Sequence, residues 1–548
     1  MVETGHHRPP PGEGAPPPLP PLGAARGPLF PPQEQLLHLH YCIHSNPSWV
    51  HTALLGFQHY IVMLGTTVLI ASTIVPLMGG GSGDKARVIQ TLLFMSAINT
   101  LIQTLIGSRL PTVMGPSFAF LIPILSTISD YSGETFDSDH QRFIHTIRTI
   151  QGSLIVSSFI IILLGFSKAW GNFTRFLSPV VIVPIVSLSG LGLFVRGFPQ
   201  LANCIQIGLP MLVLLVILQQ YLRRFLPKFH PMLERYALFL CIGIVWAFAA
   251  ILTAAGAYKH VKQTTMQSCR TDRSYLISSA PWVRIPYPFQ WGSPIFRASD
   301  VFGMMGSVLV ASAESTATFY AASRLSGATP PPAHVLSRSI GLQGIGILLD
   351  GIFGAAVGNT AAVENVGLLG LTRVGSRRVV QVSAAFMFFF SIFGKFGAFF
   401  ASIPLPIFAG IYCVLFGIVA AAGLSFIQFT NNNSMRNLYV LGLTLFLGIS
   451  IPYYFWSYTN SGNHGPVRTH AGWFNDILNT IFSSPVAVAM ILGAKLDNTL
   501  DANEAINDRG VPWWTPFQNR KGEMRNDEFY GLPLNINEYM PTRFLNRN

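Results

Sequence analysis

Charged side chains are scarce in this sequence of 548 residues: Asp, Glu, Lys and Arg together make up 11%, against about 25% in an average soluble protein. Half of the residues are hydrophobic, and the mean hydropathy is +0.44. A water-soluble chain of this length needs a polar surface that this composition cannot supply. It therefore excludes a soluble enzyme and a nucleic-acid-binding protein. Apolar runs recur from about residue 53 to residue 493, which predicts an all-α polytopic membrane protein.

Several motifs that carry chemistry are also missing. The five cysteines (Cys42, Cys204, Cys241, Cys269 and Cys413) lie far apart, without a CxxC or Cys/His pair. This spacing excludes a disulfide scaffold or a zinc site as the organising principle. The sequence has no Gly-rich phosphate loop, Walker motif or Ser/His/Asp arrangement, so we expect no enzyme, cofactor or metal. The Pro/Gly-rich start lacks the basic and apolar regions of a signal peptide, so the first span must also direct insertion.

About fourteen apolar segments are candidate transmembrane spans. The longest connection between them divides them into seven and seven, so that the second half enters the membrane from the opposite side, as an inverted repeat requires. The net charge of +12 indicates loop lysines and arginines near a negatively charged membrane face, and we expect both tails in the cytoplasm. The expected parts are a disordered Pro-rich cytoplasmic tail (1–52), a first seven-span repeat (53–256), an extracellular loop (257–300), a second seven-span repeat (301–493) and a cytoplasmic tail (494–548).

Two spans are interrupted by glycine and proline. Span three reads RLPTVMGPSFAFLIP, and span ten reads GNTAAVENVGLLGLT. Each is too short or too broken to cross the membrane as one helix, so we expect short extended segments there. A matched pair of interrupted spans is the best pointer in a sequence to a midplane binding site of a secondary transporter. The alternative is a pair of re-entrant or peripheral loops.

Three acids lie within apolar spans: Glu314, Asp350 and Glu364. A carboxylate at the centre of a span costs at least ~2.5 kcal/mol, so each must face a cavity, pair or carry a proton. We expect Glu314 and Glu364 to approach each other across a small cavity and to form a protonatable pair. The alternatives are a Glu314 carboxyl that donates to a backbone carbonyl, and a Glu364 that caps a helix. Asp350 is either a member of a proton relay or a structural acid that ties spans eight to ten together.

Three further residues are candidates for the site. Gln58 and His59 lie in the first span, where a buried histidine is often only a hydrogen-bonded core residue. Phe118 lies at the broken point of span three. Aromatic residues in spans are usually packing residues, but a ring beside carboxyls can stack on a flat heterocycle.

The segment from Glu364 to Arg373, ENVGLLGLTR, resembles the signature [QEP]-N-x-G-x-x-x-x-T-[RKG] of the nucleobase–ascorbate transporter family. The Gln58-His59 pair, the SFAF of span three and the segment from Glu314 into SRLSG are also similar to that family, in the same order. The resemblance covers about residues 53–493 and is strongest to the plant branch.

The resemblance implies a fourteen-span inverted-repeat fold, with a core domain of spans one to four and eight to eleven and a gate domain that supports a homodimer. Purine-specific relatives carry Asp four residues after the acid of span eight. This chain has Thr318 there, and the difference argues against selectivity for xanthine or urate. The resemblance implies roles for Glu314, Glu364, Asn365, Phe118, Val363 and Asp350. Together with the other observations, we expect substrate binding by Glu314, Glu364, Phe118, Val363, Thr318, Asn365 and Ser117, and coupling or structural roles for Asp350, His59, Gln58, Gly367, Thr372 and Arg373.

These observations favour a proton-coupled nucleobase carrier of the plasma membrane that moves its core domain against its gate domain like an elevator. Its expected partners are a small nucleobase, protons, the lipid bilayer and a second copy of the chain, and no nucleic acid. An ascorbate carrier of the same family is the first alternative, although an anion beside two carboxyls requires a bound cation or protonated acids. An anion exchanger of the same fold is the second.

Overall fold

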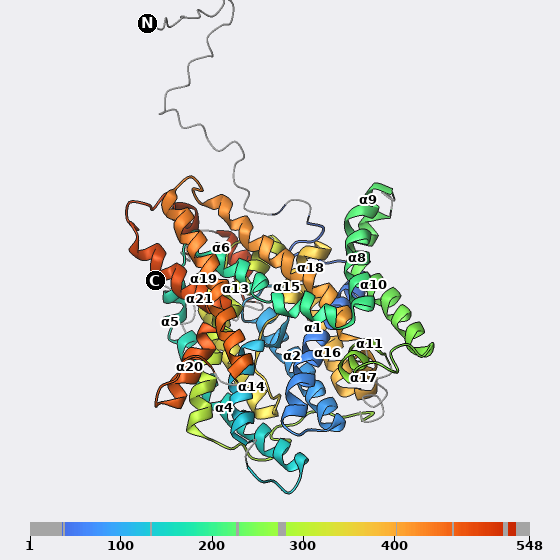
Figure 1. Ribbon diagram of the computed structural model, residues 1–548. Helices are drawn as coiled ribbons and strands as arrows, with labels where there is room; N and C mark the ends of the chain where they lie inside the picture. The colour runs from blue at the N-terminus through green and yellow to red at the C-terminus, as the bar shows by residue number, and fades with distance from the viewer. Residues whose placement is uncertain are drawn as a thin grey trace, which may run out of the picture. The chain divides into compact units, whose positions relative to one another are not determined.

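The computed structural model describes residue 36 and residues 39–131, 134–225, 229–271, 281–401, 403–462, 465–518 and 524–532. Most of the tail expected over residues 1–52 lies outside the described residues. The described chain is mainly helical (Figure 1). The helices of its first half are α1 (Trp49–Leu77), α2 (Ser82–Leu105), α3 (Leu121–Asp130), α4 (Asp139–Phe166), α5 (Ala169–Thr174), α6 (Pro179–Leu191), α7 (Phe198–Leu201), α8 (Ile205–Val216), α9 (Leu222–Phe225) and α10 (His230–Ala254).

The second half repeats this helical character after a connection that contains the short helix α11 (Gln263–Cys269). Its helices are α13 (Ala298–Ser326), α14 (Ala333–Phe353), α15 (Val363–Thr372), α16 (Arg377–Ile392), α17 (Gly394–Ala401), α18 (Leu405–Leu424), α19 (Met435–Gly462), α20 (Gly472–Phe482), α21 (Pro485–Thr499), α22 (Val511–Gln518) and α23 (Met524–Tyr530).

Within the described residues, eight helices are long and apolar enough to cross a membrane, or nine if the bent pair α20–α21 forms one span. The sequence predicts fourteen, and two features account for much of the difference. The run Pro179–Tyr221 passes as one span although the sequence divides it into two. Helices α3 and α15 have ten residues each, and a helix of that length rises only about 15 Å, half of the bilayer core.

The two interrupted segments each contain the short extended stretch that their glycines and prolines predict. Strand β1 (Met114–Pro116) pairs antiparallel with β2 (Asn359–Ala361), with Gly115 opposite Thr360. Both strands are fully buried, so their backbone groups must be satisfied by each other and by neighbouring protein. The residue before β2 must be a glycine, because a Cβ at Gly358 would lie 2.6 Å from the Phe120 ring. The pairing thus joins the first half of the chain to the second.

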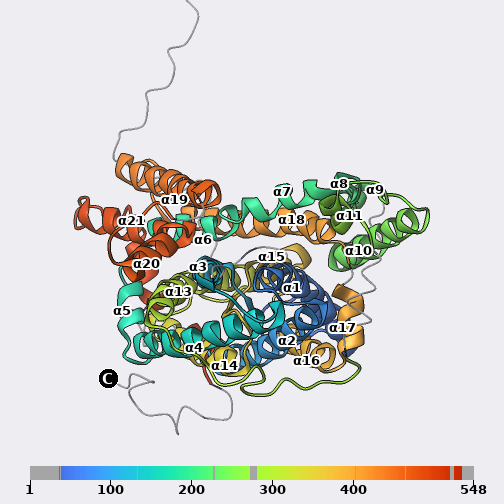
Figure 2. The same ribbon diagram turned by 60° about the horizontal axis from the view of Figure 1, so that its bottom comes forward.

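The helices form two packing groups, which are distinct in Figure 2. The strand-bearing group contains β1, β2, α1–α4 and α13–α16, in which α4 packs on α14 and α2 packs on α16. The panel group contains α6, α8, α18, α19 and α21, in which α6 packs on both α18 and α21. Helix α15 of the strand-bearing group packs on α18 of the panel group, so the two groups meet beside the strands.

Two features depart from the simplest interpretation of the sequence. Cys204 and Cys269 form a disulfide with a Cα–Cα distance of 5.4 Å, so one covalent link exists although the cysteine pattern does not organise the fold.

The tail expected from residue 494 begins inside α21 and includes α22 and α23. Trp513 of α22 stacks on Phe429 at 3.6 Å between ring centroids, so this part of the chain packs against the helical body.

Candidate functional site

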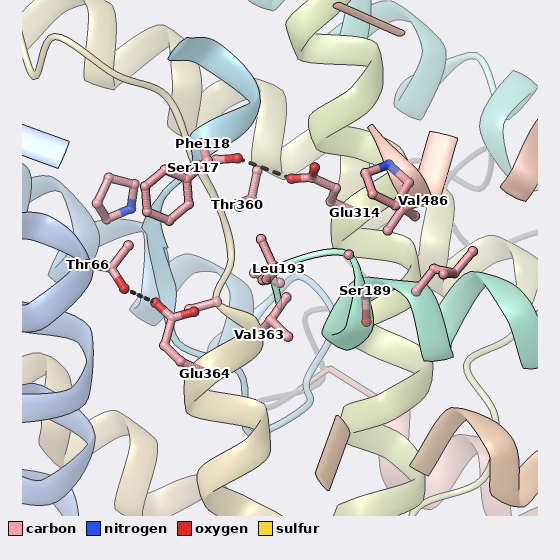
Figure 3. A pocket seen from close by; sticks show the side chains of 16 residues that line it. Thr66, Ser117, Phe118, Ser189, Leu193, Glu314, Thr360, Val363, Glu364 and Val486 are labelled. Atoms are coloured by element: carbon pink, nitrogen blue, oxygen red, sulfur yellow. Dashed lines mark hydrogen bonds between the residues drawn. The ribbon is translucent and has the colours of Figure 1, made fainter. Parts of the chain in front are cut away.

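A cavity of about 580 Å³, counting space open to solvent, lies between the two packing groups (Figure 3). Side chains of the strand-bearing group and of the panel group face each other across it. Its lining residues are Thr66, Pro116, Ser117, Phe118, Leu188, Ser189, Gly192, Leu193, Glu314, Thr360, Ala361, Ala362, Val363, Glu364, Pro485 and Val486.

Glu314 supplies one polar wall of the cavity from the middle of α13. Its Oε2 accepts a hydrogen bond from Ser117 Oγ at 3.2 Å, and its Oε1 accepts one from Ser484 Oγ at 3.4 Å. Ser117 also accepts from the backbone N–H of Ala119 at 3.1 Å and thereby caps the turn that leads into α3. Glu314 is therefore held by the β1 segment on one side and by the panel group on the other.

Glu364 supplies a second polar wall from the first turn of α15. Its Oε1 accepts a hydrogen bond from Thr66 Oγ1 of α1 at 2.5 Å, and Tyr412 Oη of α18 lies 3.0 Å from the same Thr66 oxygen. The partial positive charge at a helix N-terminus favours a carboxylate at this position. Glu364 is only 6% exposed and lies in the cavity wall.

Phe118 and Val363 lie between these two walls, one beside each strand. The guanidinium carbon of Arg196 lies 3.9 Å from the centroid of the Phe118 ring, a cation–π distance. One face of this ring is therefore covered by a cation from the segment that follows α6. The structure brings together five of the sequence-predicted binding residues: Glu314, Glu364, Phe118, Val363 and Ser117.

Thr318 and Asn365 do not line the cavity. Thr318 is fully buried, and its hydroxyl donates to the carbonyl of Glu314 at 2.8 Å. Asn365 Nδ2 donates to the carbonyl of His59 at 2.8 Å and lies 3.1 Å from Nδ1 of the same histidine. Gln58 Nε2 donates to the carbonyl of Arg235 at 3.1 Å. The hydrogen bonds of Asn365 and Gln58 tie different helices together, whereas that of Thr318 stays within α13.

Asp350 is fully buried and lies outside the cavity. Its two oxygens accept three hydrogen bonds: from Asn99 Nδ2 at 3.0 Å, from the backbone N–H of Asn359 at 2.8 Å and from Asn359 Nδ2 at 3.0 Å. Asn359 is the first residue of β2. The geometry therefore fits the structural alternative, in which Asp350 holds the start of β2 against α2 and α14.

The remaining signature residues shape α15. A Cβ at Gly367 would lie 2.5 Å from the carbonyl oxygen of Leu415, so the glycine permits close packing of α15 on α18. Thr372 donates back to the carbonyl of Leu368 at 2.8 Å. Arg373 ends the helix in the left-handed conformation, with φ of 54°, and its Nε lies 2.8 Å from Glu234 of α10. None of these three side chains lines the cavity.

No sequence motif indicates Thr66, Ser484 or Arg196. Thr66 follows His59 by seven residues, two helical turns, so the period of α1 is a signal that could have found it. Ser484 caps α21 at a bend of 84° that follows α20, within a segment that hydropathy presents as one span. Arg196 lies in a short turn that carries no motif.

The cavity combines two carboxyl groups on opposite walls with apolar surface from Leu193, Val363 and Val486. Carboxylate oxygens accept hydrogen bonds, and the intervening apolar surface excludes water from them. Such a site suits a small, flat molecule that presents N–H donors along its edges.

Comparison with known proteins finds relatives over the whole length of the chain. A sequence model of the Permease family matches residues 50–456. Nucleobase-ascorbate transporter 3 of Arabidopsis thaliana is 67% identical over 551 residues, which cover all of both chains. Nucleobase-ascorbate transporter 2 of the same plant is 58% identical over 511 residues, 93% of this chain and 98% of the relative.

Among solved structures, the transmembrane domain of a cyanobacterium bicarbonate transporter, BicA, matches 76% of this chain and 98% of its own, with 16% identity and a TM-score of 0.40. The murine Solute Carrier 26 family member A9 anion transporter in the inward-facing state matches 74% of this chain and 66% of its own, with 12% identity and a TM-score of 0.39. The family match and the high identity over the full length are decisive: this chain is a plant-branch member of the nucleobase–ascorbate transporter family.

Proposed function

We propose that this transporter takes up nucleobases, of the uracil and purine types, by proton symport. The observation that carries the proposal is the placement of Glu314 from α13 and Glu364 from α15 on opposite walls of one cavity. A neutral base offers N–H donors at fixed separations, which two fixed carboxyl groups can accept. Phe118 adds the exposed face of its ring as a surface for the flat base.

The mechanism that we propose is an elevator-like movement of a core domain against a gate domain within a fourteen-span inverted repeat. The strand-bearing group corresponds to the core and the panel group to the gate. The cavity lies between them, so a displacement of one group along the other would expose it to each side in turn. Protons are the proposed coupling ion because the polar walls of the cavity carry carboxyl groups, which can bind and release them.

We further propose that the protein is a multi-pass homodimer of the plasma membrane with both termini in the cytoplasm. The Cys204–Cys269 disulfide supports the extracellular placement of the connection after α10, because disulfides persist on the oxidising side of a membrane. The carbonyl of Ile392 at the end of α16 accepts from the N–H of Arg284 in the same connection at 2.9 Å. The start of α16 therefore lies at the opposite, cytoplasmic end, about 24 Å away along a helix of 16 residues.

One observation favours the second candidate, an ascorbate carrier. Arg196 places a cation against Phe118 at the edge of the cavity, where it could partly offset the charge of an anionic substrate. The nucleobase signature from Glu364 to Arg373 argues against an anion exchanger of the same fold.

Uptake in transport-deficient cells tests these candidates. Cells that express the protein are given labelled uracil, adenine, xanthine or ascorbate at several external pH values, in sodium and in choline medium. We expect uptake of at least one base that rises as the external pH falls, because protons are co-substrates, and that persists in choline. Loss of base uptake in choline at constant pH would show that the coupling ion is sodium. Uptake of ascorbate alone would select the second candidate.

A further inference from the structure

A hollow rich in arginine lies at the end of the fold where α1 and α16 begin, away from the substrate cavity. Its volume is about 1,000 Å³, counting space open to solvent. Arg109 comes from the turn after α2, and Arg377 and Arg378 are the first two residues of α16. His44 and Trp49 also line this hollow. We call this feature the arginine hollow.

Carboxylates in the described part of the chain balance little of the positive charge of the arginine hollow. Among the described residues, Arg109, Arg377 and Arg378 form no ion pair with a carboxylate. Glu528 lies 3.9 Å from His44, and its side chain is 64% exposed. Burial and the positive charge of Arg377 both lower the pKa of His44, and burial lowers the pKa of Arg109. The positively charged side chains therefore repel one another where water screens them only partly. A bound anion would relieve this repulsion.

The hydrogen bonds of the three guanidinium groups leave donors unused. Arg377 is engaged, because its Nε donates to the carbonyl of Arg109 at 2.6 Å and its Nη2 donates to the carbonyl of Phe529 at 3.0 Å. Arg109 Nε is buried and has no acceptor among the described residues. The guanidinium of Arg378 stacks over the ring of Trp49, 3.5 Å from its centroid. Stacking uses the face of the guanidinium and leaves its in-plane N–H groups for another ligand.

The surroundings of the arginine hollow identify the ligand by its chemistry. Guanidinium forks match the oxygens of a phosphate group, to which each can donate two parallel hydrogen bonds. The backbone N–H groups at the start of α16 add the partial positive charge of a helix N-terminus on the same side. Trp49 is 68% exposed and Val50 is 70% exposed. A tryptophan at the start of an apolar helix is typical of the membrane–water interface, where phospholipid headgroups lie.

We propose that the arginine hollow binds the phosphate group of an anion, either the headgroup of a phospholipid or a free phosphate compound. The site is separate from the substrate cavity, and its existence does not depend on which substrate is carried. With the proposed orientation it faces the cytoplasmic leaflet, where anionic lipids are concentrated.

Isothermal titration calorimetry on the full-length protein in neutral detergent tests this site. The probes are dioctanoyl phosphatidylinositol 4-phosphate, dioctanoyl phosphatidylcholine and inorganic phosphate. We expect the anionic lipid to bind and the zwitterionic lipid to bind weakly. Arg378→Gln removes an arginine that stacks on the Trp49 ring and forms no ion pair with a described carboxylate. In this variant the anionic lipid should bind about tenfold more weakly or worse.

Arg87→Gln is the matched control, because it removes the same charge from an exposed position near the start of α2, at the other end of α1 from Trp49. It should leave lipid binding unchanged. Competition by inorganic phosphate would assign the site to a free phosphate compound, and its absence would assign it to a lipid. The proposal is overturned if wild-type protein binds both lipids equally, a comparison that needs no variant. It is also overturned if folded Arg378→Gln and Arg109→Gln bind the anionic lipid as wild type does.

Discussion

Thr66 of α1 donates its hydroxyl hydrogen to Glu364 of α15 across 2.5 Å, and this bond joins the first span to the signature segment. The two residues are separated by 298 positions in the chain. The orientation of the acid in the second half therefore depends on a hydroxyl from the first half. Tyr412 of the panel group lies 3.0 Å from the same hydroxyl, so the contact also lies where the two packing groups meet.

Thr66→Val tests the role of this hydroxyl. Valine keeps the shape of threonine but removes the donor, so Glu364 loses a charge-assisted hydrogen bond and its fixed position. We expect substrate affinity to fall by roughly 1–2 kcal/mol, or about 5- to 30-fold. Thr66→Ser keeps the donor and is the control, and it should bind almost as wild type does. Equal affinities of the valine and serine variants, measured on purified protein, would contradict this role.

Arg196→Gln separates the two substrate classes. It removes the cation that covers Phe118 without removing a carboxyl group from the cavity. A carrier of neutral bases should keep its affinity for them within a few-fold, because no charge on the substrate depends on the arginine. A carrier of an anion should lose uptake by about tenfold or more. Concentration series of uracil and ascorbate uptake, normalised to surface expression, distinguish the two results. A strong loss of base uptake would show that the arginine has another role.

Asp350→Asn tests whether this acid is structural. Asparagine would present an amide N–H₂ group to donors that now meet a carboxylate oxygen, so the start of β2 would lose at least one hydrogen bond. We expect the free energy of unfolding to fall by about 1–3 kcal/mol. The folded fraction should retain its substrate affinity and the pH dependence of its uptake. Thermal unfolding in detergent and uptake at several pH values measure both quantities. Normal stability with uptake that no longer responds to pH would assign Asp350 to a proton relay instead.

The Cys204–Cys269 pairing predicts how many thiols react with a maleimide reagent in denatured protein. Three cysteines, Cys42, Cys241 and Cys413, are free in the structure. We therefore expect three adducts before reduction and five after it, counted by mass. Cys204→Ser should give four free thiols without reduction, because it releases Cys269. Five adducts before reduction in wild-type protein would show that the disulfide does not form, and would remove its support for the extracellular placement of that connection.

The sequence predicted the centre of the site better than its outer parts. Glycine and proline mark the strands at residues 114–116 and 359–361, and apolar neighbours make Glu314 and Glu364 conspicuous. Ser484 could not be found in this way, because it approaches Glu314 only through the bend between α20 and α21. Hydropathy does not record such bends. The hydropathy profile also divides the run Pro179–Tyr221 into two spans, whereas this run passes as one span in the structure. The number of spans therefore depends on how bent helices are counted.

Asp350 illustrates a second limit. An acid inside an apolar span must be satisfied, but the sequence does not say by what. Its partners Asn99 and Asn359 lie on different elements, and only the fold brings them together. Thr318 is a similar case: helical spacing places it one turn from Glu314, yet its hydroxyl bonds to the helix backbone and it lies outside the cavity.

Glu314 and Glu364 are the two acids on which the proposed function depends, and their variants separate binding from coupling. Glu364→Ala or Glu314→Ala should leave an edge of the bound base without an acceptor. The cost should be roughly 1–3 kcal/mol per lost partner, or about 5- to 150-fold in affinity. Asp139→Ala is the control for the loss of a negative charge alone, because that side chain is 84% exposed at the start of α4. It should bind as wild type does.

The corresponding Gln variants keep the length of each side chain and one acceptor but remove the proton that titrates. Glu364→Gln should retain binding and change the preference among bases, because its amide now offers a donor where the base met only acceptors. Glu314→Gln should lose most transport while still binding substrate, since we place the proton-coupled step on the acid that contacts both packing groups through Ser117 and Ser484. Binding is measured on purified, folded protein, so that it is separated from surface expression. If both Ala variants bound bases with wild-type affinity, the two acids would be packing or capping residues and the substrate would bind elsewhere.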